Sequence, residues 1–596
     1  MQNKKTGYIA GIARGHNAGV CLLKDGEIVF SIEEERLSRQ KYDGGPYAGI
    51  TKILDYTDKI DFLVISHTQE DTSRTDFSGD TVYKALARKL RLIDNVEEQV
   101  VEYHEEHHRN HAAIAFYRSG FETAASVIVD GAGTFLQLNE TETLWETETI
   151  FKCSYPANFQ KVYTHLGGRG PWESMKFTNE AGTEIIVNES AGIVKAYEAV
   201  TQYCGWQPIE AGKTMGLFPY GKQNDNFPKI YDDENGLASW TSTNRNLIIP
   251  TYPNGAIVNA NKYKCLEPTQ EMFQENFDIT TLQNRRDMAY AVQTESQQQV
   301  LNLIRKAVSD TGEKNIVISG GYGLNCVANY WYLEQLKEDG INLYIEPISN
   351  DAGTAIGAAM YHYHKISNDT KVRPKNESLY LGPVQTIEKS EIEKLAKKYK
   401  GECTYNVNYE DVINIIRDKN IVSLFQERCE NGPRALGNRS LMFDPTKEDG
   451  KDFVNLIKKR EYFRPFAASV LKDDVHDWFD LRGMEESPSM MYAVNCKEGV
   501  AEKIPAVIHV DGTCRIQTVT KEQNEHWYNL ISEFKRQTGV PALFNTSFNL
   551  GGEPLVETID DAMRTLYNSG INYIYFPSVN IMVNIPHNDR AISSHS

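Results

Sequence analysis

The segment YIAGIARGHNAGVCLLKDGEIVFSI, residues 8–32, contains three apolar runs separated by two turns. The second turn, Lys24-Asp25-Gly26, is typical of a β-hairpin, because Gly adopts the positive φ that tight hairpin turns require. We therefore expect strands at 8–12, 20–23 and 28–32 that pair as an antiparallel meander.

A second segment repeats this pattern further along the chain. The apolar run 125–129 leads into a Gly-rich turn at 130–134, and residues 143–151 are again rich in Thr, Trp and Ile. Two meanders, each followed by helical stretches, are typical of a duplicated actin-like (ASKHA) fold of the α/β class, which holds a nucleotide between its halves. The alternative is a pair of ordinary hairpins, since Asp-Gly turns are common.

The length of the chain requires more than one core. At 596 residues it exceeds the roughly 250 to 300 residues at which single hydrophobic cores stop growing. Residues 365–378 are almost entirely polar and read as a linker or domain edge. We predict one domain at 1–365 and a second at 379–596.

Composition excludes several classes of protein. No run approaches the roughly 18 apolar residues of a membrane span, and the polar start of the chain does not resemble a signal peptide. The nine cysteines form no C-x-x-C pair, which fits a reducing compartment, and the formal charge of −18 disfavours general nucleic-acid binding. We expect a cytoplasmic protein whose oligomeric state the sequence does not determine; a homodimer is compatible with it.

Four residues could together hold a metal ion. His107 and His111 stand four residues apart in a helical segment, so both imidazoles lie on one face. Asp130 and Asp351 each open a Gly-containing turn after an apolar run. This donor set suits Fe(II), Mn(II) or Zn(II) with a position left for substrate. The alternative for the histidines is an ordinary surface or core position.

Two Gly-bearing segments are candidates for nucleotide or phosphate contacts. The first, at 212–221, contains Lys213 and Gly216, and the second, at 319–325, contains Gly320, Gly321 and Asn325. We expect both to be turns whose backbone N–H groups, with the lysine, reach a phosphate. Neither is a Walker loop, and tight strand-to-helix turns are the alternative.

The second domain carries a denser set of candidate anion ligands. Its cations alternate with small and apolar residues, so they are expected against packed surface, where they need anionic partners such as phosphate or, alternatively, neighbouring glutamates. Short hydrogen-bonding side chains follow near residue 545, apt for a ribose or carbamoyl group. The candidates are Arg428, Arg434, Arg439, Lys458, Arg460, Arg464, Asn545, Ser547 and Asn549.

Taken together, these strings resemble the carbamoyltransferase family that includes the nodulation-factor, cephamycin, novobiocin and nebramycin carbamoylating enzymes. The resemblance covers most of the chain. Its motifs, in chain order, are GHN at 15–17, EEERLSRQK at 33–41, HHRNHAA at 107–113, the segments 212–221 and 319–325, NDAG at 350–353, GPRALGNRS at 432–440 and NTSFN at 545–549.

The resemblance implies a division of the chemistry between an actin-like N-terminal domain and an α+β, YrdC-like C-terminal domain. The C-terminal domain would convert carbamoyl phosphate and ATP, with Mg(II), to carbamoyl adenylate, and Lys458-x-Arg460 resembles the signature of that domain. The N-terminal domain would hold Fe(II) on His107, His111, Asp130 and Asp351. His16 would take the proton from the hydroxyl of a small-molecule acceptor.

Two other functions fit parts of the sequence. A tRNA-modifying threonylcarbamoyl transferase would share both half-domains, although the acidic charge and the GPRALG string argue against it. A non-catalytic nucleotide-binding scaffold would lack ligands, and none of the matched ligands is missing. The sequence leaves open whether the acceptor is an aminoglycoside, sugar, lipo-oligosaccharide, alkaloid or modified nucleoside.

Overall fold

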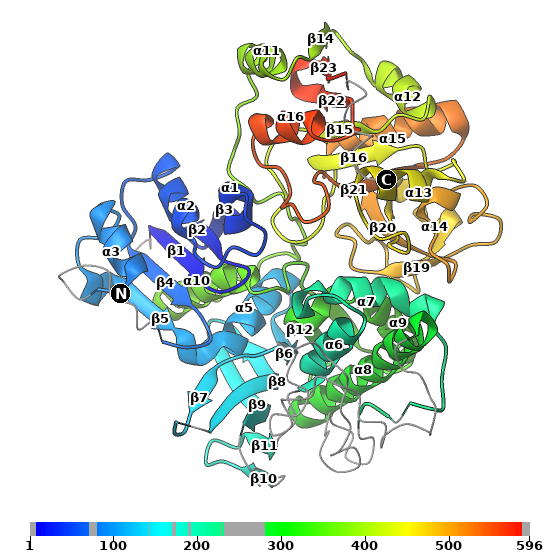
Figure 1. Ribbon diagram of the computed structural model, residues 1–596. Helices are drawn as coiled ribbons and strands as arrows, with labels where there is room; N and C mark the ends of the chain where they lie inside the picture. The colour runs from blue at the N-terminus through cyan, green and yellow to red at the C-terminus, as the bar shows by residue number, and fades with distance from the viewer. Residues whose placement is uncertain are drawn as a thin grey trace. The chain divides into compact units, whose positions relative to one another are not determined.

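The computed structural model describes residues 7–70, 80–140, 142–169, 175–188, 192–227, 229–231 and 281–586 (Figure 1). The chain forms two compact units. Unit 1 comprises Met1–Val29 with Gly44–Asn376, and unit 2 comprises Phe30–Asp43 with Glu377–Ser596. The segment Phe30–Asp43 is tied to unit 2 by hydrogen bonds from Asn431 to Ser31 Oγ (2.8 Å) and from Arg36 to the Gly432 carbonyl (2.6 Å). The domain limits 1–365 and 379–596 stay predictions.

The first sheet of unit 1 has the order β3-β2-β1-β4-β5. Its strands are β1 (Tyr8–Ala13), β2 (Gly19–Lys24), β3 (Glu27–Glu33), β4 (Phe62–Ser66) and β5 (Val100–Tyr103). β2 runs antiparallel to β1, whereas β4 is parallel to β1 and β5 is parallel to β4. The predicted strands at 8–12, 20–23 and 28–32 are therefore confirmed.

The second sheet repeats this order as β9-β8-β6-β12-β13. β8 (Thr143–Ser154) is antiparallel to β6 (Thr123–Val129) and to β9 (Asn158–Arg169). β12 (Asn315–Ser319) is parallel to β6, and β13 (Asn342–Ile345) is parallel to β12. The sheet is extended by β7 (Phe135–Gln137), β10 (Met175–Thr178) and β11 (Glu184–Asn188). One strand order, used twice, confirms the duplicated actin-like fold.

Two buried helices of unit 1, α5 (His107–Ser119) and α10 (Ala352–Ser367), pack against each other (Figure 1). The contact is close: a Cβ atom on Gly357 would lie 1.9 Å from the backbone oxygen of Asn110. α10 also packs on β1, where a Cβ atom on Gly11 would lie 2.0 Å from the Ala355 oxygen. Glycine is therefore required where the two helices, and the helix and the sheet, cross.

The other helices of unit 1 lie around the two sheets. They are α2 (Tyr47–Lys52), α3 (Val82–Lys89), α4 (Val96–Gln99), α6 (Gly192–Tyr203), α7 (Ala211–Leu217), α8 (Leu282–Thr311) and α9 (Cys326–Gln335). Within the described ranges no helix has both the length and the hydropathy needed to cross a membrane.

Unit 2 is an α+β domain built on a ten-stranded sheet of order β14-β23-β22-β15-β16-β21-β17-β20-β19-β18. The strands are β14 (Glu402–Tyr405), β15 (Val422–Phe425), β16 (Arg439–Phe443), β17 (Ala467–Leu471), β18 (Phe479–Asp480), β19 (Ala493–Cys496), β20 (Thr513–Val519), β21 (Ala542–Ser547), β22 (Tyr573–Phe576) and β23 (Ile581–Asn584). The helices are α1 (Glu34–Ser38), α11 (Lys389–Lys398), α12 (Tyr409–Arg417), α13 (Gly450–Ile457), α14 (Val475–Trp478), α15 (Glu525–Thr538) and α16 (Ile559–Tyr567). A separate C-terminal domain is thus confirmed, and its likeness to YrdC stays a prediction.

We expect Gly357→Ala to destabilise unit 1 by roughly 2 to 3 kcal/mol, because the added methyl group has no space where α5 crosses α10. Urea unfolding followed by circular dichroism measures the shift in midpoint. Gly212→Ala on α7 is the control, since no atom lies within 4 Å of its Cβ position. Equal effects of the two substitutions would contradict the packing argument.

Candidate active site

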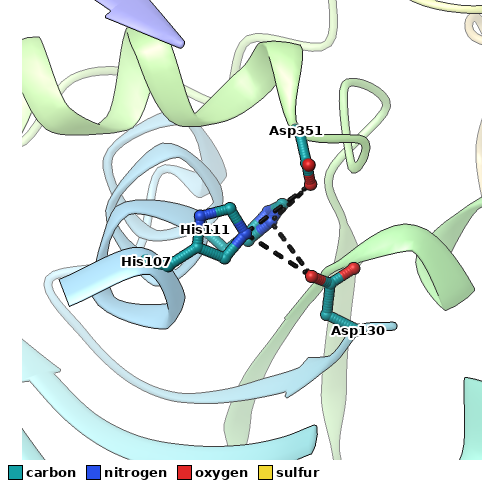
Figure 2. Close-up of side chains that lie close together, drawn as sticks. All are labelled: His107, His111, Asp130 and Asp351. Carbon is teal, nitrogen blue, oxygen red and sulfur yellow. Dashed lines mark ion pairs between the residues drawn. The ribbon is translucent and has the colours of Figure 1, made fainter. Parts of the chain in front are cut away.

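The four predicted metal ligands converge in unit 1 (Figure 2). Their ligand atoms all lie within 4.8 Å of one another, although the residues come from three separate segments of the chain. His107 Nε2 lies 3.5 Å from Asp130 Oδ2 and 3.6 Å from Asp351 Oδ1. His111 Nε2 lies 3.5 Å from Asp351 Oδ1 and 3.9 Å from Asp130 Oδ2.

The fold explains this convergence. α5 begins at His107, so His111 follows one helical turn later on the same face. Asp130 directly follows β6, and Asp351 is the residue before α10. Since α5 and α10 are locked together at Gly357, the packing that holds the helices also fixes the imidazoles relative to Asp351.

The side chains fit a divalent metal. Both histidines are buried, and neither Nε2 atom has a hydrogen-bond partner among the described residues. The nitrogen-to-oxygen distances of 3.5 to 3.9 Å are too long for hydrogen bonds but suit ligand atoms arranged around one ion. Two imidazoles and two carboxylates are a donor set for Fe(II), Mn(II) or Zn(II).

The pKa values of the clustered side chains reflect two carboxylates held close together, a negative charge that suits a central cation. Burial by itself would lower the pKa of His107, but the carboxylates of Asp130 and Asp351 outweigh it and raise that pKa to about 10. Burial would raise the pKa of Asp351, but His16, His107 and His111 hold it well below its usual range. A proton on His107 therefore balances part of the buried negative charge that a divalent ion would neutralise.

Further contacts orient these ligands. Asp130 Oδ1 accepts a hydrogen bond from the Gly321 backbone N–H at 3.0 Å, and His111 Nδ1 lies 3.3 Å from Ser319 Oγ. Gly320 has a φ of +90°, and a Cβ atom there would lie 2.4 Å from the Val129 oxygen. The predicted turn at Gly320-Gly321 thus supports the cluster directly, as outer-shell partners of metal ligands do.

His16, the predicted base, lies at the edge of the cluster. Its Nδ1 atom is 3.7 Å from Asp351 Oδ2, and 56% of its side chain is exposed. The imidazole is therefore close to the candidate metal centre and open to solvent.

Lys195 and Glu198, which sequence reasoning missed, lie on the other side, next to Asp130. A Cβ atom on Gly131 would lie 3.5 Å from Lys195 Nζ and 3.1 Å from Glu198 Oε1. The two side chains form an ion pair at 2.7 Å. Burial tends to lower the pKa of Lys195, but Glu198, with Asp130 and Asp351, raises it. The sequence signal that could have indicated this pair is its spacing of three residues, which places both side chains on one face of α6.

The segment 212–221 is not the turn that was predicted. Residues 211–217 instead form the helix α7, which its two glycines do not interrupt. Lys213 pairs with Glu210 at 2.8 Å, and Gly216 is buried in α7. Asn325 is the N-cap of α9 and exchanges amide hydrogen bonds with Gln293. Binding of phosphate by Lys213, Gly216 and Asn325 stays a prediction that these contacts do not support.

In unit 2 the structure brings the predicted cations of the segment 458–464 to the end of β21. Lys458 Nζ donates to the Ser547 carbonyl and lies 3.3 Å from Asn549 Oδ1, and Arg460 donates to Thr546 Oγ1 at 3.5 Å. Ser547 Oγ donates to Asn549 Oδ1 at 2.6 Å. Residues far apart in sequence thus form one polar group, which we call the cation cluster: Lys458, Arg460, Arg464 and Arg515.

The members of the cation cluster repel one another. Burial, followed by Arg460 and Arg464, holds the pKa of Lys458 well below its usual range. Burial, Arg464 and Arg515 likewise lower the pKa of Arg460. The sequence analysis did not identify Arg515 on β20, because no motif surrounds it. Only the pairing of β20 with β17 shows where it lies. Lys458 is buried and the three arginines are partly buried, and Arg464 lies 3.6 Å from Glu461. A bound anion would stabilise such a group further.

The remaining predicted anion ligands hold the protein itself together. Arg439 is fully buried and donates to the backbone carbonyls of residues 426, 427, 438 and 557, and Arg428 donates to those of Leu381 and Gly382. Asn545 donates to the Ala435 carbonyl and to Ser469 Oγ. Arg434 is half-buried. These contacts explain the positions of Arg428, Arg439 and Asn545 without a ligand. Ligand binding by these residues and by Arg434 stays a prediction.

Comparison with known proteins identifies the family. Residues 72–360 match the carbamoyltransferase N-terminus and residues 413–582 match the carbamoyltransferase C-terminus. An uncharacterized protein, sll1178, of Synechocystis is 31% identical over 95% of this chain and 95% of its own length. The chain belongs to the carbamoyltransferase family. It is a carbamoyltransferase, and the resemblance found from its motifs is confirmed.

Other members of the family come from nodulating bacteria. Nodulation protein NolNO of Sinorhizobium fredii is 28% identical over 94% of this chain and 77% of its own length. Nodulation protein U of the same organism is 34% identical, over 40% of each chain. Among solved structures, full-length HypF in a phosphate- and nucleotide-bound form matches 61% of this chain and 56% of its own, with 13% identity and a TM-score of 0.36.

We expect His111→Ala and Asp351→Asn to lose most of the metal that the wild-type protein retains, because each removes one of four ligands. Dialysis against Fe(II) under anaerobic conditions, followed by elemental analysis, measures the bound metal. His104→Ala is the control, since this imidazole is 29% exposed and lies beside Glu102 outside the cluster. Unchanged metal content in all three variants would exclude the site.

We expect anion binding to the cation cluster to take up a proton. The folded pKa of Lys458 lies well below the unfolded value of 10.5, so its amine is neutral in the free protein between those two values. In that pH window the unfolded chain binds more protons, and stability rises with pH. A bound anion raises the pKa and favours the charged form.

Calorimetric titration with sulfate, in buffers of different ionisation enthalpy, measures this proton uptake, because sulfate itself does not titrate near neutrality. Lys458→Met should abolish the uptake. Lys459→Met is the control, since the neighbouring lysine is exposed. Proton uptake that persists in Lys458→Met would show that another group is responsible.

Proposed function

We propose that this carbamoyltransferase uses ATP, with Mg(II), to convert carbamoyl phosphate to carbamoyl adenylate and then transfers the carbamoyl group to a hydroxyl of a small molecule. The observation that carries the proposal is the presence, in one chain, of a partly buried cation cluster in unit 2 and of a His/Asp cluster in unit 1, formed by His107, His111, Asp130 and Asp351. The first suits phosphate chemistry and the second suits acyl transfer to oxygen.

Adenylate formation is assigned to unit 2. Hydrolysis of carbamoyl phosphate releases phosphate and carbamate, and a carbamate oxygen then attacks the α-phosphorus of ATP while the bond to pyrophosphate breaks. Lys458, Arg460 and Arg464 would neutralise the charge on the phosphates, and Arg515 would add a fourth cation. Ser547 and Asn549, which contact Lys458, would orient the carbamoyl end.

Transfer is assigned to unit 1. The acceptor oxygen attacks the carbamoyl carbon, the bond from that carbon to the AMP oxygen breaks, and AMP leaves with the electron pair. His16 would accept the proton of the acceptor hydroxyl, and Asp351, 3.7 Å away, would stabilise the imidazolium that forms. A metal ion held by His107, His111, Asp130 and Asp351, for which we propose Fe(II), would supply Lewis-acid polarisation of the carbonyl.

Separate losses of the two half-reactions test this division. We expect Lys458→Ala to abolish the exchange of labelled pyrophosphate into ATP that depends on carbamoyl phosphate. His107→Ala should retain that exchange and lose transfer, because it removes a ligand in unit 1 only. If His107→Ala also lost the exchange, while its fold was intact by circular dichroism, the assignment would be wrong.

The same assay distinguishes the alternative chemistry. Purified protein should release AMP from ATP only when carbamoyl phosphate is present. Release that instead depends on threonine with bicarbonate would point to a threonylcarbamoyl transferase.

A further inference from the structure

The His/Asp cluster has two different flanks. Near Asp130 lie the backbone N–H of Gly321 and the Lys195–Glu198 pair, which together form a polar and partly cationic wall. Near Asp351 lies the loop after β1, with Gly15 and His16. A transferase that joins two substrates needs a place for each, so the Asp351 flank, which holds the proposed base, is the place to look for the acceptor.

A second imidazole faces the Asp351 flank. A Cβ atom on Gly15 would lie 3.8 Å from His67 Nε2 and 4.0 Å from Asp351 Oδ2, so these two groups border the same small region. His67 directly follows β4, the strand parallel to β1, and its side chain therefore emerges at the same sheet edge as His16. Neither the metal cluster nor the proposed mechanism uses it.

The local contacts of His67 leave one nitrogen available. Nδ1 faces the backbone of Gln69, 3.1 Å from its oxygen and 3.2 Å from its nitrogen. Both hydrogen-bond contacts that the described residues make with this ring fall on Nδ1, and Nε2 lies beside Gly15. Burial, then the charge of Arg14, lowers the pKa of His67 to about 4, so the ring is neutral at pH 7. In either tautomer Nε2 can pair with a hydroxyl group, which both donates and accepts.

Arg14 and Tyr47 complete this flank. The Arg14 guanidinium donates to the Gln69 carbonyl at 2.9 Å, next to His67, and lies 5.9 Å from the centre of the Tyr83 ring. The ring of Tyr47 stacks on Tyr83 at 5.7 Å and is 49% exposed. The loop that precedes Tyr47 is attached to the site, because Gly15 N–H donates to the Gly44 carbonyl at 3.2 Å.

We propose that Arg14, His67 and Tyr47 form the acceptor subsite, and that the acceptor is a polyhydroxylated ring compound that is neutral or anionic. The inference rests on the proposed carbamoyl transfer and adds the substrate class to it. The half-exposed Tyr47 ring offers aromatic surface to the apolar face of such a compound, and His67 Nε2 takes a second hydroxyl beside the one that reacts at His16. The Arg14 guanidinium donates hydrogen bonds to neutral or anionic oxygen and repels a polycation.

The test uses three matched monosaccharides as probes: methyl α-glucoside, the corresponding glucuronide, and the corresponding glucosaminide. These differ in charge at one substituent and are neutral, anionic and cationic. Transfer of label from carbamoyl phosphate gives KM and kcat for each probe, and saturation-transfer NMR gives binding without turnover. We expect the neutral and anionic probes to bind and to be carbamoylated, and the cationic probe to be at least about tenfold worse than the anionic one.

Variants separate binding from structure. His67→Ala should raise the acceptor KM about five- to tenfold with kcat nearly unchanged, as the loss of one neutral hydrogen bond predicts, and His67→Gln should recover part of this loss. Arg14→Met should weaken the anionic probe most. Tyr47→Ala should weaken all three, whereas Phe177→Ala on β10, whose side chain is 48% exposed, is the matched control that should weaken none.

The outcomes distinguish this inference from the proposed function. If no pyrophosphate exchange occurs but the probes bind and the variants weaken them, the subsite stands and the proposed reaction fails. If exchange is intact but none of the probes binds, or the cationic probe is preferred, the substrate class is wrong. Equal kinetics of wild type, His67→Ala and Arg14→Met on every probe would exclude the subsite.

Discussion

The crossing of α5 and α10 is the constraint on which the rest of unit 1 depends. Gly357 lets the helices approach until no side-chain atom fits between them, and α10 in turn packs on β1 through Gly11. Each helix carries part of the site: α5 starts with His107 and His111, and α10 starts immediately after Asp351. A rigid interior contact is thereby converted into a fixed separation of ligand atoms, which a metal centre needs.

Both units hold like charges close together in buried or partly buried positions, where a ligand of opposite charge would reduce the repulsion. In unit 1 two carboxylates face two imidazoles at distances too long for hydrogen bonding. In unit 2 burial and neighbouring cations lower the pKa values of Lys458, Arg460 and Arg464. A divalent cation in unit 1 or a phosphate in unit 2 would add an attractive partner to groups that the fold already holds in place, as expected of a preorganised site.

Electrostatic asymmetry also divides the His/Asp cluster. The Asp130 side meets backbone N–H groups and a lysine, while the Asp351 side meets histidines and an exposed tyrosine further out. Actin-like sheets place these elements on opposite sides because Asp130 follows a strand of the second sheet, whereas the Gly15–His16 loop and His67 follow strands of the first. The duplication of the fold therefore supplies two chemically distinct walls around the four clustered side chains.

Local signals in the sequence were sufficient for the strands of the two meanders, for the presence of a separate C-terminal domain and for the four residues that come together in the His/Asp cluster. Asp-Gly turns and alternating apolar runs are decided within a few residues, and His107 and His111 share a helix. Only the tertiary structure distinguished two kinds of cation. Lys458 and Arg460 contact the polar end of β21, whereas the Arg439 guanidinium donates to backbone carbonyls. The structure also showed that the segment around Lys213 is helical, that His67 lies near Asp351 and that Arg515 lies near Arg460. The physical reason is that a charge or an imidazole is defined by what surrounds it, and those surroundings come from strands that are distant in the chain.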